Sequence, residues 1–203
     1  RTVAVDLAQL DAVREAGAEG RDDDVLSVMA PQFGALVAFL RTPDGAAMGP
    51  EGRAVVARAL VALGRSLMRV ERMDECGDAL RLAAQYAQDG PAAPEVYLCL
   101  GESLLASGRA AEAIGPLRRA TALDPALRPK VLPLLARCYL DTGRAVAAAG
   151  LIESLRAAGH DVTALEAKAS AALGEAWAPW RRACEGRRAV VVPIDGTVVS
   201  AEG

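Results

Sequence analysis

Apolar residues of two sizes recur at helical spacing through the middle of the chain. Leu100 and Leu104 lie four residues apart before a break at Gly108, and Ala113 and Leu117 repeat that interval after it. Such intervals place side chains on one face of an α-helix. Small residues beside large ones allow two helices to approach closely. The pattern therefore predicts two antiparallel helices that pack through these faces.

The same order of residues occurs three times along the chain. Gly64, Gly101 and Ala136 take equivalent places, 37 and 35 residues apart. Insertions between the copies fall where proline and glycine predict joints, and such insertions cost little. We therefore predict three helical hairpins of similar length, at 57–90, 94–127 and 129–162.

Glycine marks the turn inside two of these hairpins. Gly108 and Gly143 follow the first helix of the second and third copies. A left-handed residue commonly ends a helix, and glycine adopts that conformation most readily. Glu71 stands in this place in the first copy, so that copy lacks the turn signal.

The residues before the repeats, 1–56, predict an N-terminal arm or helical cap. We expect, in chain order, a strand or extended arm at 2–5, a helix from Leu7 to near Gly17, a charged loop at 19–24, and a helix at 24–40 with a candidate break at Pro31. Proline and glycine then indicate loops at 43–45 and 49–52.

The residues after the repeats predict a capping helix and a tail of another kind. The helix extends from Thr163, the expected N-cap with Glu166 as its capping-box partner, to about residue 184, so the repeats and this helix together span 57–184. Trp177 and Trp180 either pack this helix on the third repeat or form an exposed aromatic pair for a partner. In the tail, 185–203, β-branched residues flank 195–196, an Asp-Gly pair, and predict a short β-hairpin.

The middle copy resembles a tetratricopeptide repeat. It has the family's order of anchors, Tyr97-x2-Leu100-Gly101-x2-Leu104 followed by Ala113-x3-Leu117-x2-Ala120-x4-Pro125. The resemblance implies an all-α fold: a right-handed superhelix of three repeats, with an N-terminal helical cap, a C-terminal capping helix and the β-hairpin tail.

The resemblance also implies a binding surface, because the first helices of such repeats line a concave groove that takes a peptide segment. The family's groove positions are half apolar and half charged in this chain: Arg58, Val61, Arg65, Met68, Glu95, Leu98, Glu102, Leu105, Lys130, Pro133, Arg137 and Leu140. Members that clamp a C-terminal carboxylate use Asn, which this chain lacks. Arg65 and Arg137 around Leu98, Leu105 and Leu140 suit an apolar or amphipathic segment with acidic residues.

A narrower resemblance, over about residues 57–176, is to bacterial type III secretion chaperones of the translocator class. It implies a bacterial adaptor or chaperone that holds a segment of another protein. Residues 1–56 and the tail do not fit that class. The alternative is a structural subunit of a larger bacterial assembly, an oligomer or complex held through its N-terminal arm and β-tail.

Composition argues against other classes of function. Aromatic residues make up 3% of the chain and the net charge is −3, which disfavours nucleic-acid binding. His160 is the single histidine, and no metal-ligand spacing, phosphate loop or nucleophile motif occurs. We therefore predict no enzyme, cofactor or metal site, and interpret 22–24, three aspartates, as the solvated start of a helix. No run of about 18 apolar residues is evident, so we expect no membrane span.

Four cysteines, Cys76, Cys99, Cys138 and Cys184, form no CxxC pair. We expect buried, reduced thiols, and a Cys99–Cys138 bridge is the alternative. The prediction for location is cytoplasmic. A periplasmic location stays open because the sequence begins at Arg1 and not at methionine.

Overall fold

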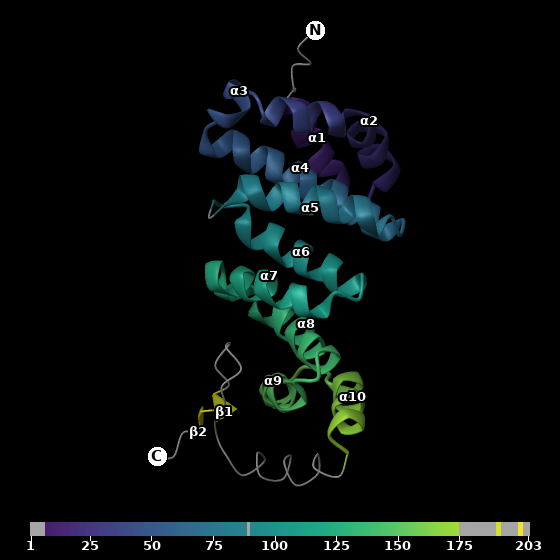
Figure 1. Cartoon of the computed structure of the whole chain (residues 1–203), viewed down its shortest axis with the longest axis vertical. Helices are drawn as coiled ribbons and strands as arrows, with labels where there is room; N and C mark the ends of the chain where they lie inside the picture. Colours follow the sequence, from purple (N-terminus) through teal and green to yellow (C-terminus); the bar gives the residue numbers. More distant parts are fainter. Residues whose placement is uncertain (1–6, 89, 175–189, 192–198, 201–203) are drawn as a thin grey trace. The chain divides into compact units, whose positions relative to one another are not determined.

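A computed structural model describes residues 7–88, 90–174, 190–191 and 199–200 (Figure 1). Nearly all of these residues are helical. The chain divides into two compact units, 1–103 and 104–203, and the boundary falls within one helix. Each unit is described by itself below.

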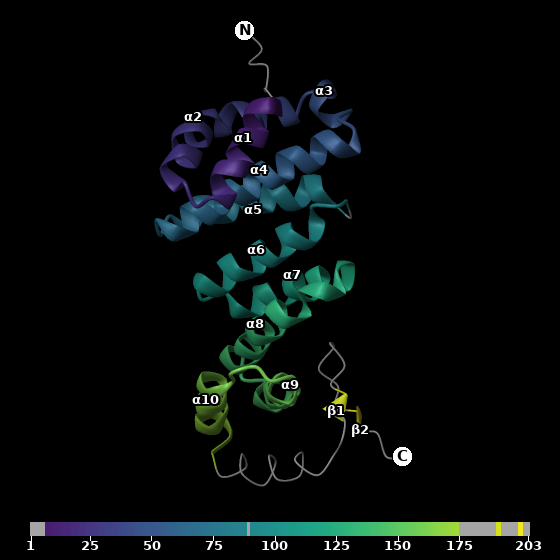
Figure 2. The same cartoon turned by 180° about the vertical axis from the view of Figure 1, so that it is seen from behind.

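The first unit contains five helices and most of a sixth. They are α1 (Leu7–Ala18), α2 (Asp22–Leu40), α3 (Pro43–Ala46), α4 (Pro50–Arg69), α5 (Met73–Ala87) and α6 (Ala93–Ala106), which continues into the second unit. The helix α4 lies at the centre: α5 packs along it, and α1 and α2 also contact it (Figures 1 and 2).

The N-terminal helices differ in detail from their predicted bounds. The predicted helix from Leu7 is confirmed as α1, but α2 begins at Asp22, inside the expected charged loop. Pro31 is exposed and does not end α2. Residues 43–45, expected as loop, belong to the short helix α3, whose first turn is capped by the Thr42 hydroxyl. Most of the second expected loop, 49–52, is also helical, because α4 begins at Pro50. The expected strand at 2–5 lies outside the described residues.

Three bonds fix the start of α2 to α4. The Asp22 carboxylate accepts hydrogen bonds from the buried Ser66 hydroxyl at 2.7 Å and from Nε of Arg69 at 2.7 Å, and a second Arg69 nitrogen also donates to it. The prediction that the aspartates at 22–24 are merely solvated is therefore wrong for Asp22. Hydrogen bonding by Arg69 lowers the pKa of this carboxyl group, against a smaller opposite effect of burial.

The helix α2 bears on the expectation that no run of apolar residues could span a membrane. It is long and apolar enough to cross a membrane by length and composition, and 22% of that stretch is buried. The core helix of a soluble protein and a signal sequence pass the same test. The expectation that no stretch of this length and composition occurs is therefore wrong, and the expectation of no membrane span stays a prediction.

The predicted close contact in the first hairpin is present. Gly64 of α4 faces Leu80 of α5, and a Cβ atom at residue 64 would lie 2.7 Å from Cδ2 of that leucine. Both residues are buried, together with Leu60 and Cys76. The alternation of small and large residues thus brings these two helices together, as the sequence pattern predicts.

The second unit contains the end of α6, four further α-helices, one 3-10 helix and two short strands among the described residues. They are α7 (Ala110–Leu123), η1 (Pro125–Leu127), α8 (Arg128–Asp141), α9 (Ala145–Ala157), α10 (Thr163–Leu173), β1 (Val190–Val191) and β2 (Val199–Ser200). The helix α8 packs against both α7 and α9. The repeat positions Leu117, Leu135 and Ile152 are all buried.

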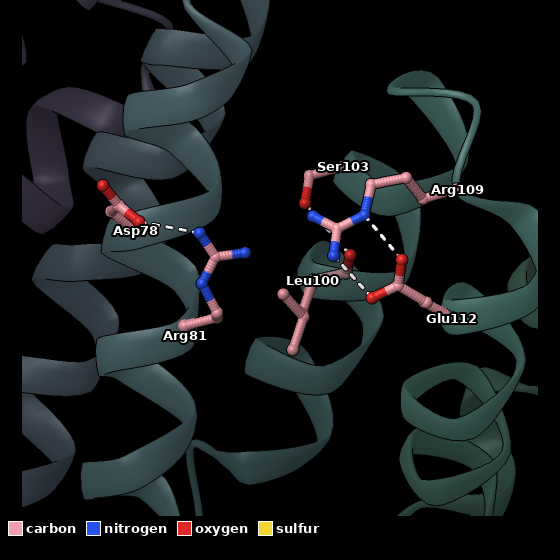
Figure 3. Close-up of polar contacts among 6 residues, drawn as sticks. All are labelled: Asp78, Arg81, Leu100, Ser103, Arg109 and Glu112. Atoms are coloured by element: carbon pink, nitrogen blue, oxygen red, sulfur yellow. Dashed lines mark hydrogen bonds and ion pairs between the residues drawn. The ribbon is translucent and has the colours of Figure 1, made fainter.

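One turn recurs between consecutive helices. Glu71, Gly108 and Gly143 all have left-handed backbone, with φ of 61°, 74° and 74°. In each turn the following arginine donates its N–H to a carbonyl five residues earlier, at 2.7–2.9 Å. The Arg109 side chain then bonds to Glu112, three residues later (Figure 3). The first hairpin therefore has the same turn although Glu71 replaces glycine.

The α1–α2 connection has this turn as well. Gly20 has φ of 73°, the N–H of Arg21 donates to Ala16 at 2.9 Å, and the Arg21 side chain bonds to Asp24 at 2.6 Å. The two N-terminal helices are therefore joined as a fourth hairpin. The sequence signal for this turn is Gly-Arg-x-x-Asp at 20–24, which is not among the apolar anchors of the repeat.

The start of α10 corrects the predicted capping box. Thr163 is the first residue of the helix and not its N-cap, which is Val162 without a side-chain cap; the Asp161 carboxylate accepts from the backbone N–H of Thr163 at 3.0 Å and from its hydroxyl at 2.7 Å. Glu166 instead forms an ion pair with Arg156 of α9. Residues 177 and 180, the two tryptophans, lie outside the described residues.

Charged groups dominate the attachment of α10. Besides the pair with α9, Lys168 forms an ion pair with Asp141 of α8. Ala169 is the one residue of α10 that is fully buried. Two ion pairs therefore join α10 to the hairpin of α8 and α9.

Two short strands are the part of the predicted tail that the structure describes. Val190 pairs with Ser200 and Val191 with Val199, in antiparallel order. A two-residue turn at 195–196 without a bulge would pair Val190 with residue 201, so the observed register differs by one residue. This pairing does not by itself support the predicted hairpin, and residues 195–196 lie outside the described residues.

The cysteines follow the main expectation where the structure describes them. Cys76, Cys99 and Cys138 are free and buried, so the alternative of a Cys99–Cys138 bridge is wrong. Burial raises the pKa of Cys99 to about 12. Burial also raises the pKa of Cys138, to about 11, with a smaller contribution from Asp141. Cys184 lies outside the described residues.

Candidate partner-binding surface

Four of the predicted groove residues lie along one side of α4. Arg58, Val61, Arg65 and Met68 follow one another at intervals of three and four residues, which places them on one helix face. Val61 is buried, and the other three are half-buried. This face therefore presents two arginines separated by an apolar floor.

A pocket of about 210 Å³ lies at this face, within the first unit. Its lining comes from three helices: Arg14, Gly17 and Ala18 of α1, Arg58, Val61, Ala62 and Arg65 of α4, and Glu95 of α6. The structure thus brings together four predicted groove residues, Arg58, Val61, Arg65 and Glu95. Arg14, Gly17, Ala18 and Ala62 were not predicted, and no repeat template could have placed the N-terminal helix here.

The close crossing of α1 over α4 forms one wall of the pocket. A Cβ atom at Gly17 would lie 2.7 Å from Cβ of Ala62, so glycine is required for this approach. Arg14 precedes Gly17 by one helical turn and lines the same pocket. The small residue therefore positions the arginine of α1 beside those of α4.

Two of the three arginines have acidic neighbours. Arg65 donates to Glu95 at 2.8 Å, and Arg14 bonds to Asp11 at 3.1 Å and Glu15 at 3.3 Å. Burial acts to lower the pKa of Arg65, but acidic groups around it, including Glu95, raise the pKa overall, so it stays charged.

Arg58 differs from its two neighbours. Within the described part of the chain it forms neither an ion pair nor a hydrogen bond through its side chain. Its side chain is half-buried at the pocket, and no residue that the structure describes forms an ion pair with its positive charge there.

The predicted apolar contacts of the groove are not accessible. Leu98, Leu105 and Leu140 are 5%, 4% and 7% exposed, so the expectation that they face solvent is wrong. Helical periodicity shows which residues share a face, but it cannot show how many neighbours cover that face. Glu102 of α6, by contrast, is half-exposed.

The remaining groove residues belong to the second unit. Lys130 and Arg137 of α8 are exposed, and Arg137 lies 3.8 Å from Asp141. Leu140, the apolar residue predicted beside them, is buried.

Two other hollows lie in the first unit. One, of about 240 Å³, is bounded by Pro50, Arg53 and Tyr86, and the Tyr86 hydroxyl donates to the carbonyl of Leu40 at 2.9 Å. The other, of about 80 Å³, lies between α2, α4 and α5 beside Phe33. Among the residues described, no cluster of His, Cys, Asp or Glu could hold a metal ion.

Comparison with known proteins supports the repeat assignment. Residues 104–171 match a family model described as tetratricopeptide repeat. No curated protein matches the chain significantly.

A solved structure has a similar fold. It is the crystal structure of nearly identical TPR-like repeats of a Podosopora anserina protein described as a kinesin light chain. The two chains are 17% identical, the TM-score is 0.56, and the alignment covers 88% of this chain and 89% of the other. At this identity the likeness shows the fold alone.

The observed hairpins have the helices, the turns and the close glycine contact that this repeat requires. Residues 104–171 therefore match the sequence of the tetratricopeptide repeat, and the fold of the chain is that of tetratricopeptide-like repeats.

Proposed function

We propose that this protein is an interaction module, an adaptor or chaperone, that holds a segment of a partner protein. Tetratricopeptide repeats generally mediate contacts between proteins and are typically not enzymes. The observation that carries the proposal is the pocket on the first unit, where α1, α4 and α6 meet around Arg58, an arginine that forms no ion pair with any described residue.

The binding surface in this proposal is centred on α4. Arg58, Arg65 and Met68 are half-buried and offer both charge and apolar contact, and Glu102 adds an acidic group at its edge. An extended or helical segment with apolar and acidic residues would match this mixture. Lys130 and Arg137 offer separate charged contacts on the second unit.

The cellular setting is also a proposal. Three free, buried thiols fit a reducing compartment, and we propose a cytoplasmic location. A bacterial origin and the narrower resemblance to translocator chaperones stay predictions. The alternative of a structural subunit depends on the N-terminal arm, which is described from residue 7 onward, and on the tail, of which only 190–191 and 199–200 are described.

Selection from a phage-displayed library of random peptides tests the proposal. The full chain is immobilised, and enriched peptides are synthesised and titrated by fluorescence anisotropy. We expect a shared consensus whose binding weakens in the Arg65→Ala variant and persists in Arg118→Ala, a matched change on α7 of the second unit. If no peptide is enriched over an unrelated helical protein, the chain is not a peptide-binding module.

A further inference from the structure

The pocket on the first unit has a defined distribution of charge. Arg58 and Arg65 stand two helical turns apart on α4, about 10 Å along the axis, with Val61 between them. Arg14 approaches from α1. Three guanidinium groups therefore line one small pocket, against a single carboxylate, that of Glu95.

The pairs already present leave these arginines available. The Arg14 pairs are solvent-exposed, with 42% of its side chain accessible, and such pairs contribute little and exchange readily. Arg65 is bound to Glu95 through one nitrogen, Nη1, in the interaction observed at 2.8 Å. Arg58 carries no compensating charge among the residues described. An added negative group would therefore gain a partner without first breaking a buried pair.

The floor of the pocket suits the stem of a short side chain. Ala18, Val61 and Ala62 provide apolar contact below the guanidinium groups. Methylene groups would lie on this floor while a carboxylate reached the arginines, and arginine binds carboxylates with two parallel hydrogen bonds. A basic side chain of a partner would fit this pocket less well, because its carboxylate, that of Glu95, is already bound to Arg65.

We infer that this pocket takes a glutamate or aspartate side chain of the partner segment, with Arg58 as its main contact and Arg65 and Arg14 beside it. The inference rests on the proposed function and specifies which residue of the segment the first unit recognises. The three arginines bind the carboxylate of this residue, and Val61 and Ala62 contact its methylene groups.

Matched peptide sets test the inference. The full chain is probed with arrays of peptides, each with one fixed central residue, Glu, Asp, Gln, Asn or Lys, and randomised apolar neighbours. We expect the acidic sets to bind at least about tenfold more tightly than their amide counterparts. The Arg58→Gln variant should lose this preference, and Arg58→Lys should keep part of it.

Arg81 provides a matched control. It is an exposed arginine on α5 that pairs with Asp78 and does not line the pocket (Figure 3). Arg81→Gln removes the same charge from the same unit, so it should leave the preference for acidic peptides unchanged. Circular dichroism checks that each variant keeps its helical content.

A second measurement needs no variant. The probe is N-acetylglutamate N-methylamide, with the glutamine compound as its control, added to isotopically labelled full-length protein. We expect the Nε–Hε signal of Arg58 and the amide signals of Val61 and Ala62 to shift with the glutamate probe alone. Equal shifts with both probes overturn the inference.

The other outcomes separate this inference from the proposed function. Peptide binding without preference for an acidic residue, or unchanged in Arg58→Gln, overturns the inference and leaves the interaction module standing. Preference for the Lys set would make Glu95 the recognition group and would also overturn it. If sedimentation shows that Arg58→Gln separates a dimer, the pocket is an interface between copies. Absence of any bound peptide counts against both proposals.

Discussion

Glu71 has the same left-handed backbone conformation between α4 and α5 that Gly108 has between α6 and α7. The two φ angles are 61° and 74°, and the following N–H donates to an equivalent carbonyl in each turn. Residues with a Cβ atom rarely adopt this conformation. The geometry of the turn is therefore imposed by the hairpin and not by glycine alone.

Replacing Glu71 with glycine should stabilise the protein. The change removes the steric cost of the Cβ atom, partly offset by the greater chain entropy of glycine, so we expect a gain of about 0.5–1 kcal/mol in the free energy of unfolding. Urea denaturation measures it. Gly108→Ala should lower the free energy of unfolding by about 1 kcal/mol. A loss of stability in Glu71→Gly would show that its side chain has a favourable role in the turn.

Gly64 and Gly115 provide a matched pair of substitutions to alanine. A Cβ atom at Gly64 meets buried Leu80 at 2.7 Å, so Gly64→Ala should destabilise the chain by about 1–3 kcal/mol. Gly115 of α7 has no atom within 4 Å of that position, so Gly115→Ala should stabilise its helix by about 0.5–1 kcal/mol. Thermal melts of both variants check the difference. Similar effects from the two changes would argue against the tight α4–α5 packing.

Asp22→Asn should destabilise the attachment of α2 in a pH-dependent way. Bonds from Arg69, the largest cause, lower the pKa of Asp22 below its ordinary value of 3.8. A lowered folded-state pKa contributes stability above that ordinary value, and the contribution disappears as pH falls through the folded-state pKa. The difference in thermal midpoint between wild type and variant should therefore be full at neutral pH and shrink in acid. Asp23→Asn, an exposed neighbour, should show little difference at any pH, and a constant gap for Asp22→Asn would rule out the charge as its cause.

The three described cysteines should resist thiol reagents in the folded protein. Burial excludes the reagent from Cys76, Cys99 and Cys138, and the raised pKa values of their thiols keep the reactive thiolate scarce at mildly alkaline pH. Labelling with Ellman's reagent, followed by mass spectrometry of digested protein, assigns each site. In concentrated guanidinium chloride all four cysteines should react. Rapid labelling of Cys99 without denaturant would contradict its position in the core.

The hairpins could be predicted from sequence because their helices pack through regular small and large residues, as Gly64 and Leu80 do. The binding surface could not. Leu98 lies on the expected face, yet it is buried, because coverage depends on neighbouring helices that no repeat template specifies. The pocket beside Arg58 depends on Arg14, which reaches it through the close approach of Gly17 to α4. That approach joins positions more than 40 residues apart and leaves no local signal.

The attachment of α10 to α8 and α9 should depend on ionic strength. Its two interhelical ion pairs, Arg156–Glu166 and Lys168–Asp141, are partly exposed, and salt screens such pairs over about 8 Å at physiological ionic strength. Ala169 adds only a small apolar contact. Hydrogen exchange in this unit should therefore begin at α10 and quicken with added salt, while the α8–α9 hairpin stays protected. Among the described helices of the second unit, α10 is therefore the one whose contacts should weaken most as salt is added.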